Sequence, residues 1–347
     1  MPPLLVSEAW CEFPRGARGR KAIDAVCASA RRYLAPLILV LGSAPAAAPA
    51  QEVPVPDDPP VQASPSAPSA QAGAPGEANA ATKKVIEDEA EYKAYVAAVN
   101  TQDPREQAEA MEAFIRKYPK SVVAAEAMER AMWDWQSVGD AIKVLEVAKE
   151  LLGVDSGNVR ALAVVVALDR ISAAQGDSAA LDEICRYSTA GMREVSMWQK
   201  PAGMTDADFA LLNKQMGGIF NSAAGYCALE QRNFLQARDW FTRAIEADAT
   251  DLQDMYDLVI SDLELTPIDV NGFWYCAKAI QLAKSSPNAG AAGGMEAYCK
   301  PKYETYHGAV QGWDAILSAG ATQNALPAGF AGGIEPAPAP PAAVKQK

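Results

Sequence analysis

The sequence predicts an all-α fold, a solenoid built from antiparallel helix hairpins. Between residues 82 and 320, Ala, Glu, Leu and Met recur at helical spacing, whereas the alternation of β-branched and aromatic residues typical of strands is scarce. Turn signals divide this region about every 12–18 residues. Several of them carry a helix-capping residue, as at Asp103, Asp140 and Thr205. Short helices joined by tight turns favour stacked hairpins, and therefore an internal repeat.

Residues 1–50 are typical of a secretory signal peptide. They hold six basic and three acidic residues, and the apolar stretch YLAPLILVLGSA follows the basic region. Ala48, Pro49 and Ala50 then form a small-x-small site before Gln51. The apolar stretch is too short to cross a bilayer, which takes about twenty residues. We therefore expect cleavage near Ala50-Gln51 and a soluble protein in the periplasm or outside the cell.

Two further segments are predicted to be disordered. Residues 51–81 consist mainly of Pro, Ala, Ser and Gly and contain no aromatic residue. Such a composition cannot bury enough surface to offset the entropy lost on ordering, so an extended linker is expected. Residues 321–347 end in a similar Pro/Ala-rich stretch and are predicted to form a disordered tail.

The charge of the chain excludes some classes of partner. The formal net charge is −12, and without residues 1–50 it becomes −15. An acidic surface repels the phosphate backbone, so we expect no nucleic-acid partner. It is equally unsuited to an anionic lipid surface, and no embedding in a membrane is expected.

Residues 221–251 contain the best-formed repeat unit. Small residues at fixed spacing would let two helices approach closely, and an aromatic ring would fill the repeat seam, the line where neighbouring helices meet. In this unit the seam residues are Gly225, Ala228, Ala237, Phe241 and Ala244. Weaker copies of the spacing place Gly272, Cys276 and Ala279, and also Ala141, Leu145 and Ala148, in the seam.

This spacing resembles the tetratricopeptide repeat (TPR). Asn221 stands where that family often has Trp, Ala228 where it often has Tyr, and Ala249 replaces the usual Pro. The segments KYETYHGAVQGWDAIL and WQKPAGMTDADF are similar to parts of uncharacterised exported bacterial TPR proteins. The resemblance implies a TPR-like solenoid over residues 82–320, whose concave groove binds a protein or peptide.

Two tryptophans are the best candidates for contact with a partner. Trp133 and Trp135 are two residues apart, so they cannot face the same side of a helix, and one of them is expected to be exposed. The candidate polar residues of the groove are Arg130, Gln136, Asn158 and Arg160.

The sequence offers little for catalysis. His307 is the only histidine, and we expect it in a turn, where it caps or packs against Tyr306. The Gly-rich nucleotide-binding patterns and the GxSxG pattern are absent. We therefore predict a non-enzyme without cofactor or metal, whose function is scaffolding between proteins. The alternative is binding or processing of cell-wall glycan, with tryptophans stacked on sugars.

Four cysteines remain after residue 50: Cys185, Cys227, Cys276 and Cys299. An exported protein can form disulfides, and four cysteines allow three pairings. Their wide, irregular spacing instead favours small apolar residues buried between helices. A thiol-redox role is a further alternative.

Overall fold

The computed structural model describes residues 84–201, 203–287 and 289–338. Within these ranges the chain forms twelve α-helices and no strand, so the predicted all-α fold is confirmed. The helices are α2 (Glu89–Val99), α3 (Pro104–Lys117), α4 (Ala124–Val138), α5 (Ala141–Val154), α6 (Val159–Ala173), α7 (Ser178–Met197), α8 (Asp206–Glu230), α9 (Phe234–Ala247), α10 (Leu252–Leu263), α11 (Gly272–Lys284), α12 (Ala291–His307) and α13 (Trp313–Thr322). The predicted signal peptide and most of the linker lie outside the described residues.

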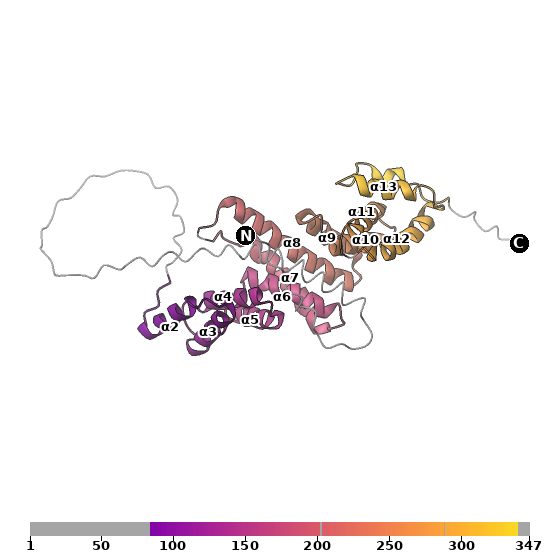
Figure 1. Cartoon of the computed structure of the whole chain (residues 1–347). Helices are drawn as coiled ribbons and strands as arrows, with labels where there is room; N and C mark the ends of the chain where they lie inside the picture. The colour runs from indigo at the N-terminus through magenta and orange to yellow at the C-terminus, as the bar shows by residue number, and fades with distance from the viewer. Residues whose placement is uncertain (1–83, 202, 288, 339–347) are drawn as a thin grey trace, which may run out of the picture.

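Neighbouring helices in the sequence are also neighbours in space. From α2 to α12 each helix packs against the next, while α13 packs against α11. In Figure 1 the helices follow one another from α2 at one end to α13 at the other, without a return of the chain. The architecture is therefore a solenoid of antiparallel hairpins, in which α3, α5, α7, α9 and α11 are the second helices.

Three of the second helices, α3, α5 and α9, bury side chains at the same positions relative to the capping residue. Asp103, Asp140 and Asn233 each accept a hydrogen bond from a backbone N–H in the first turn of α3, α5 and α9. Residues four, eight and eleven positions after each cap are buried: Gln107, Met111 and Phe114; Val144, Ala148 and Leu151; Ala237, Phe241 and Ala244. The repeat is thus visible in the positions of the buried residues, counted from the cap, even where the residue types differ.

This register corrects one predicted copy of the repeat. Ala141 and Leu145 are only half-buried, and the residues equivalent to Ala237, Phe241 and Ala244 begin three positions later, at Val144. Both sets of residues have the same internal spacing, so spacing alone could not separate them. The position of the cap Asp140 decides between them.

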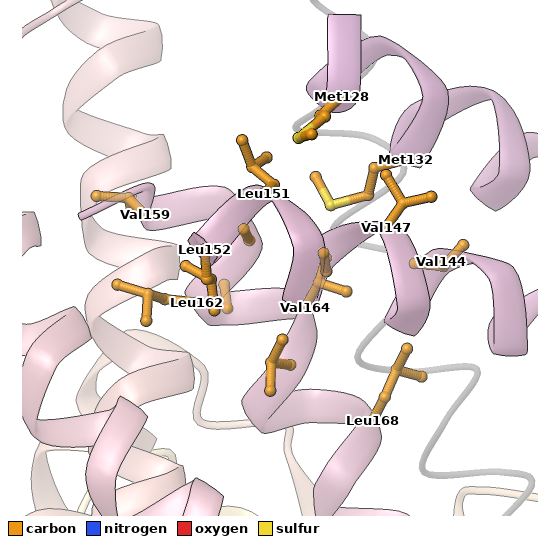
Figure 2. Packing of buried hydrophobic residues seen from close by; sticks show 14 of the residues in the cluster. Met128, Met132, Val144, Val147, Leu151, Leu152, Val159, Leu162, Val164 and Leu168 are labelled. Atoms are coloured by element: carbon orange, nitrogen blue, oxygen red, sulfur yellow. The ribbon is translucent and has the colours of Figure 1, made fainter. Parts of the chain in front are cut away.

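The core is a series of apolar clusters along the solenoid. The largest extends from α2 to α8, another lies between α8 and α11, and the last joins α10 to α13. Figure 2 shows the first of these, where Met128 and Met132 of α4 lie near Leu151 and Val147 of α5. Each apolar cluster is formed by helices that are close to one another in the chain, as expected for a repeat structure.

The two longest helices, α7 and α8, are neighbours at the junction of two hairpins. These helices have 20 and 25 residues, and a Cβ atom on Gly191 of α7 would lie 2.2 Å from the ring of Phe220 in α8. Only glycine permits this approach of the two helices. Across the described ranges, none of the helices combines the length and apolar character that crossing a bilayer demands.

The folded region continues past the predicted boundary at Gly320. A 3-10 turn, Phe330–Gly333, follows α13, and Ile334 is buried in the last apolar cluster. The N–H of Ala337 donates to the carbonyl of Tyr306 at 2.6 Å. The predicted tail therefore packs onto the last hairpin as far as residue 338, because its few apolar residues find a surface there.

Candidate functional site

A buried polar cluster around Arg170 joins three helices. From the last turn of α6, the guanidinium donates to Asp257 Oδ2 at 2.7 Å, to Asp254 Oδ1 at 3.1 Å and to the hydroxyl of Ser222. Ser222 Oγ in α8 donates in turn to Asp254 Oδ1 at 2.6 Å. Arg170 is 9% exposed, and the two aspartates are each 4% exposed. We call these four residues the Arg170 cluster.

Local sequence explains how α10 presents both carboxylates. Asp254 and Asp257 are three residues apart, so they lie on the same face of the helix. Asp251 caps this helix by accepting from the N–H of Asp254, and Gln253 donates to Asp257 Oδ1 at 2.9 Å. The Arg170 guanidinium lies 5.1 Å from the centre of the Tyr226 ring. The cluster therefore fixes the relative placement of α6, α8 and α10.

Burial shifts the titration of this region. Loss of hydration, together with repulsion from the neighbouring Asp254 carboxylate, raises the pKa of Asp251 to about 7. Burial also raises the pKa of Asp257 to about 6, against the opposing effect of Arg170. One guanidinium thus offsets only part of the cost of burying these carboxylates.

A second polar group lies between α5, α6 and α7. Lys149 Nζ is 2.5 Å from Glu183 Oε2 and 3.4 Å from Asp169 Oδ2. Burial, followed by the hydrogen bond with Glu183, raises the pKa of Asp169 to about 7. Burial opposes ionisation of Glu183 as well, but hydrogen bonds from Lys149 and Asp169 lower its pKa overall. Below pH 7 Asp169 is therefore mainly protonated, and Glu183 carries the charge that pairs with Lys149.

Asp262 of α10 gives a pH-dependent prediction. It is 1% exposed, its Oδ1 has no hydrogen-bond partner, and burial followed by repulsion from Asp269 raises its pKa to about 8. A carboxyl with a raised pKa in the folded state binds its proton more tightly than in the unfolded chain. The stabilisation is complete below the unfolded pKa and is lost as pH rises through the folded pKa. We therefore expect the urea midpoint to decrease as the pH rises from the ordinary carboxyl pKa towards about 8, and to level off near pH 9.

The matched variant is Asp262→Asn, which keeps the shape and removes the charge. It is expected to raise the urea midpoint at pH 9 and to flatten the decline between pH 7 and pH 9. Asp206→Asn, at an exposed position, is the control and leaves that decline unchanged. A decline that is equally steep in Asp262→Asn and in the parent chain would contradict the assignment.

Neither tryptophan of the candidate pair is exposed. Trp135 is 3% exposed, and its Nε1 donates to Glu112 Oε1 at 2.7 Å. Trp133 is half-buried and packs against the largest apolar cluster. The expectation that one of the two indoles is exposed is therefore wrong. The sides of α4 that carry Trp133 and Trp135 both pack against other parts of the protein.

Three of the four candidate polar residues belong to two networks near α4, whereas the buried side-chain amide of Gln136 has no hydrogen-bond partner among the described residues. Arg130 donates to Gln107 Oε1 at 2.7 Å and lies 3.3 Å from Asp134. Asn158 caps α6, and together with Arg160 it donates to the Glu129 carboxylate, at 2.5 and 3.0 Å. Gln136 is 2% exposed. Arg130 keeps the most exposed side chain, at 43%, so the structure places only part of this set at the surface.

The seam residues near α9 and α11 are buried. Gly225 faces Phe241, with 2.9 Å between the ring and a Cβ built on the glycine. The remaining buried members are Ala228, Ala237, Ala244, Gly272, Cys276 and Ala279, together with Ala148 in α5. His307 ends α12, where its Nδ1 lies 2.8 Å from the carbonyl oxygen of Glu335 and its ring lies 5.3 Å from that of Tyr303. It thus packs on Tyr303, one turn earlier in the helix, whereas the sequence favoured capping or packing on Tyr306.

The four cysteines form two disulfides. Cys185 of α7 bonds to Cys227 of α8, and Cys276 of α11 bonds to Cys299 of α12. The expectation of unpaired cysteines is therefore wrong. Their wide spacing in the sequence is the spacing between adjacent antiparallel helices.

Sequence reasoning missed the Arg170 cluster. Its members are up to 87 residues apart, and no local motif unites them. The available signal was an arginine inside the apolar helix VRALAVVVALDRISA and aspartates at three-residue spacing in α10. Over the described ranges, no group of three or more His, Cys, Asp or Glu side chains has a geometry that could hold a metal ion. The contacts that the Arg170 cluster does show are those of a buried ion network.

Comparison with known proteins adds no relative. No protein-family model, no curated protein and no solved structure matches the chain.

Proposed function

We propose that this protein is an exported, non-catalytic scaffold of TPR-like hairpins that binds another protein in the periplasm or cell envelope. The observation that carries the proposal is the stacking of antiparallel hairpins in chain order from α2 to α13. Stacked hairpins present a continuous surface formed by equivalent helices, and such surfaces bind extended peptides or helices.

The two disulfides support the exported location. Disulfides persist in oxidising compartments such as the periplasm and are rare in the cytosol. Each joins a pair of adjacent helices, α7 to α8 and α11 to α12. This agrees with the signal peptide expected from residues 1–50, which lie outside the described residues.

The polar networks of α4 and α6 support a partner-binding surface at these two helices. Arg130 and Arg160 keep part of their guanidinium groups accessible, with side chains 43% and 23% exposed. Arg160 also lies 5.8 Å from the ring centre of the half-buried Trp198. Guanidinium groups already held by Glu129 and Asp134 are oriented to donate to carboxylates or carbonyls of a bound segment.

The glycan-binding alternative gains no support from the tryptophans. Stacking on a sugar requires an exposed indole face. All six tryptophans within the described residues are buried or half-buried: Trp133, Trp135, Trp198, Trp240, Trp274 and Trp313.

Affinity purification tests the scaffold proposal. A tagged chain, cross-linked in cells and purified from envelope extract, is expected to enrich a defined protein partner. The double variant Arg130→Ala/Arg160→Ala is expected to lose it, whereas the exposed control Leu235→Ala retains it. Purified peptidoglycan is expected not to sediment the protein. Recovery of no specific partner, or co-sedimentation with peptidoglycan, would contradict the proposal.

A further inference from the structure

The two disulfides differ in their access to solvent. Cys276 and Cys299 are both 0% exposed and lie inside the last apolar cluster. Cys185 and Cys227 are only half-buried, near the end of α8. A dissolved thiol can reach a disulfide sulfur only where the sulfur is accessible, so burial alone separates the two bonds.

A side-chain amide lies beside the more accessible disulfide. Gln231, an exposed residue directly after α8, places its Nε2 at 3.3 Å from Cys227 Sγ and 3.9 Å from Cys185 Sγ. An N–H donor stabilises a thiolate more than a neutral sulfur, because a hydrogen bond to a charged group is stronger. The shorter distance makes Cys227 the better leaving group.

We propose that Cys185–Cys227 is a thiol-exchange site for a monothiol such as glutathione, while Cys276–Cys299 is a permanent cross-link. A thiolate attacks Cys185 Sγ, a new S–S bond forms there, and the old bond breaks. Its electron pair leaves on Cys227 Sγ, which Gln231 stabilises. A second thiolate then attacks the sulfur of the bound thiol, and Cys185 leaves as a thiolate that takes a proton from water. Two thiols are oxidised to one disulfide, and the protein disulfide is reduced.

The exchange changes the restraint between the two longest helices, α7 and α8. The disulfide joins residues 42 apart and closes a loop that contains most of α7 and α8. Its cleavage removes that covalent restraint from the two helices, while the second disulfide keeps α11 joined to α12.

Differential alkylation of the native, fully oxidised chain tests the proposal. After incubation with reduced glutathione, acid quenching and alkylation, peptide mass spectrometry is expected to find label on Cys185 and Cys227. Trapped glutathione is expected on Cys185, and label on Cys276 and Cys299 only after addition of a denaturant. Reduction of both disulfides at the same rate, or of Cys276–Cys299 first, would overturn the proposal. So would a Cys185–Cys227 bond that resists glutathione until the chain is denatured.

The variant Gln231→Ala tests the role of the amide. It is expected to slow the first exchange step roughly 10-fold, since a hydrogen bond to a charged group is lost. Gln199→Ala, at another exposed glutamine, is the matched control and keeps the parent rate. Circular dichroism checks that both variants remain helical. Equal rates of the first exchange step in both folded variants would show that Gln231 has no role in the exchange.

Discussion

Arg170→Ala is expected to lower the free energy of unfolding by about 3–5 kcal/mol, because it leaves two buried carboxylates without their cation. Asp254 and Asp257 lie at 3.1 and 2.7 Å from the guanidinium and are each 4% exposed. Urea denaturation followed by circular dichroism measures the change. The variant Arg193→Ala, which removes an arginine 68% exposed at its side chain, is the control and is expected to change stability by less than about 0.5 kcal/mol.

A combined variant separates the loss of a cation from the loss of packing. Arg170→Met with Asp254→Asn and Asp257→Asn keeps similar side-chain volumes and removes all three charges. It is expected to recover much of the stability lost in Arg170→Ala, since replacing a whole buried ion group costs less than removing one partner. If Arg170→Ala costs no more than the exposed control, the Arg170 cluster does not join these helices.

Phe241→Ala is expected to cost about 3–5 kcal/mol of unfolding free energy, since the ring is fully buried in the repeat seam. Gly225→Ala is expected to cost about 1–3 kcal/mol, because its Cβ would lie 2.9 Å from that ring. In the double variant the new methyl group enters space left by the ring. Its cost is expected to be smaller than the sum of the single costs by about 1 kcal/mol or more.

Gly217→Ala is the matched control for this experiment. It lies in the same helix as Gly225, but no atom lies within 4 Å of a Cβ built at that position. We expect it to stabilise the protein by about 0.5–1 kcal/mol, the gain from replacing a helical glycine. Additive costs for Phe241→Ala and Gly225→Ala would show that the close approach of α8 to α9 does not depend on this pair.

Local sequence predicted the all-helical fold and three of the helix starts. The caps Asp103, Asp140 and Thr205 act through side chains on the following turn, so the sequence holds the whole interaction. The seam near Phe241 was also predictable from local sequence, because its small and aromatic residues fit only one register. The spacing that begins at Ala141 fitted two registers, and only the position of the cap Asp140 showed which of the two is buried.

Contacts between distant helices were not predictable in this way. Arg170 meets Asp254 across 84 residues, and the two disulfides join cysteines 42 and 23 residues apart. Each pairing depends on which helices are neighbours, which local patterns do not state. The prediction of an exposed tryptophan was wrong for a related reason. A helix that is packed on several sides buries residues that point in different directions.

The packing of residues 323–338 has a consequence for self-association. Ile334 and Phe330 cover part of α12 and α13, and the Ala337 N–H and the Glu335 carbonyl contact the end of α12. A stack of hairpins with a bare apolar end can add a further copy and grow into a filament. In this protein, residues 323–338 of the same chain already cover part of that apolar end. A second molecule would have to displace them before head-to-tail growth could begin.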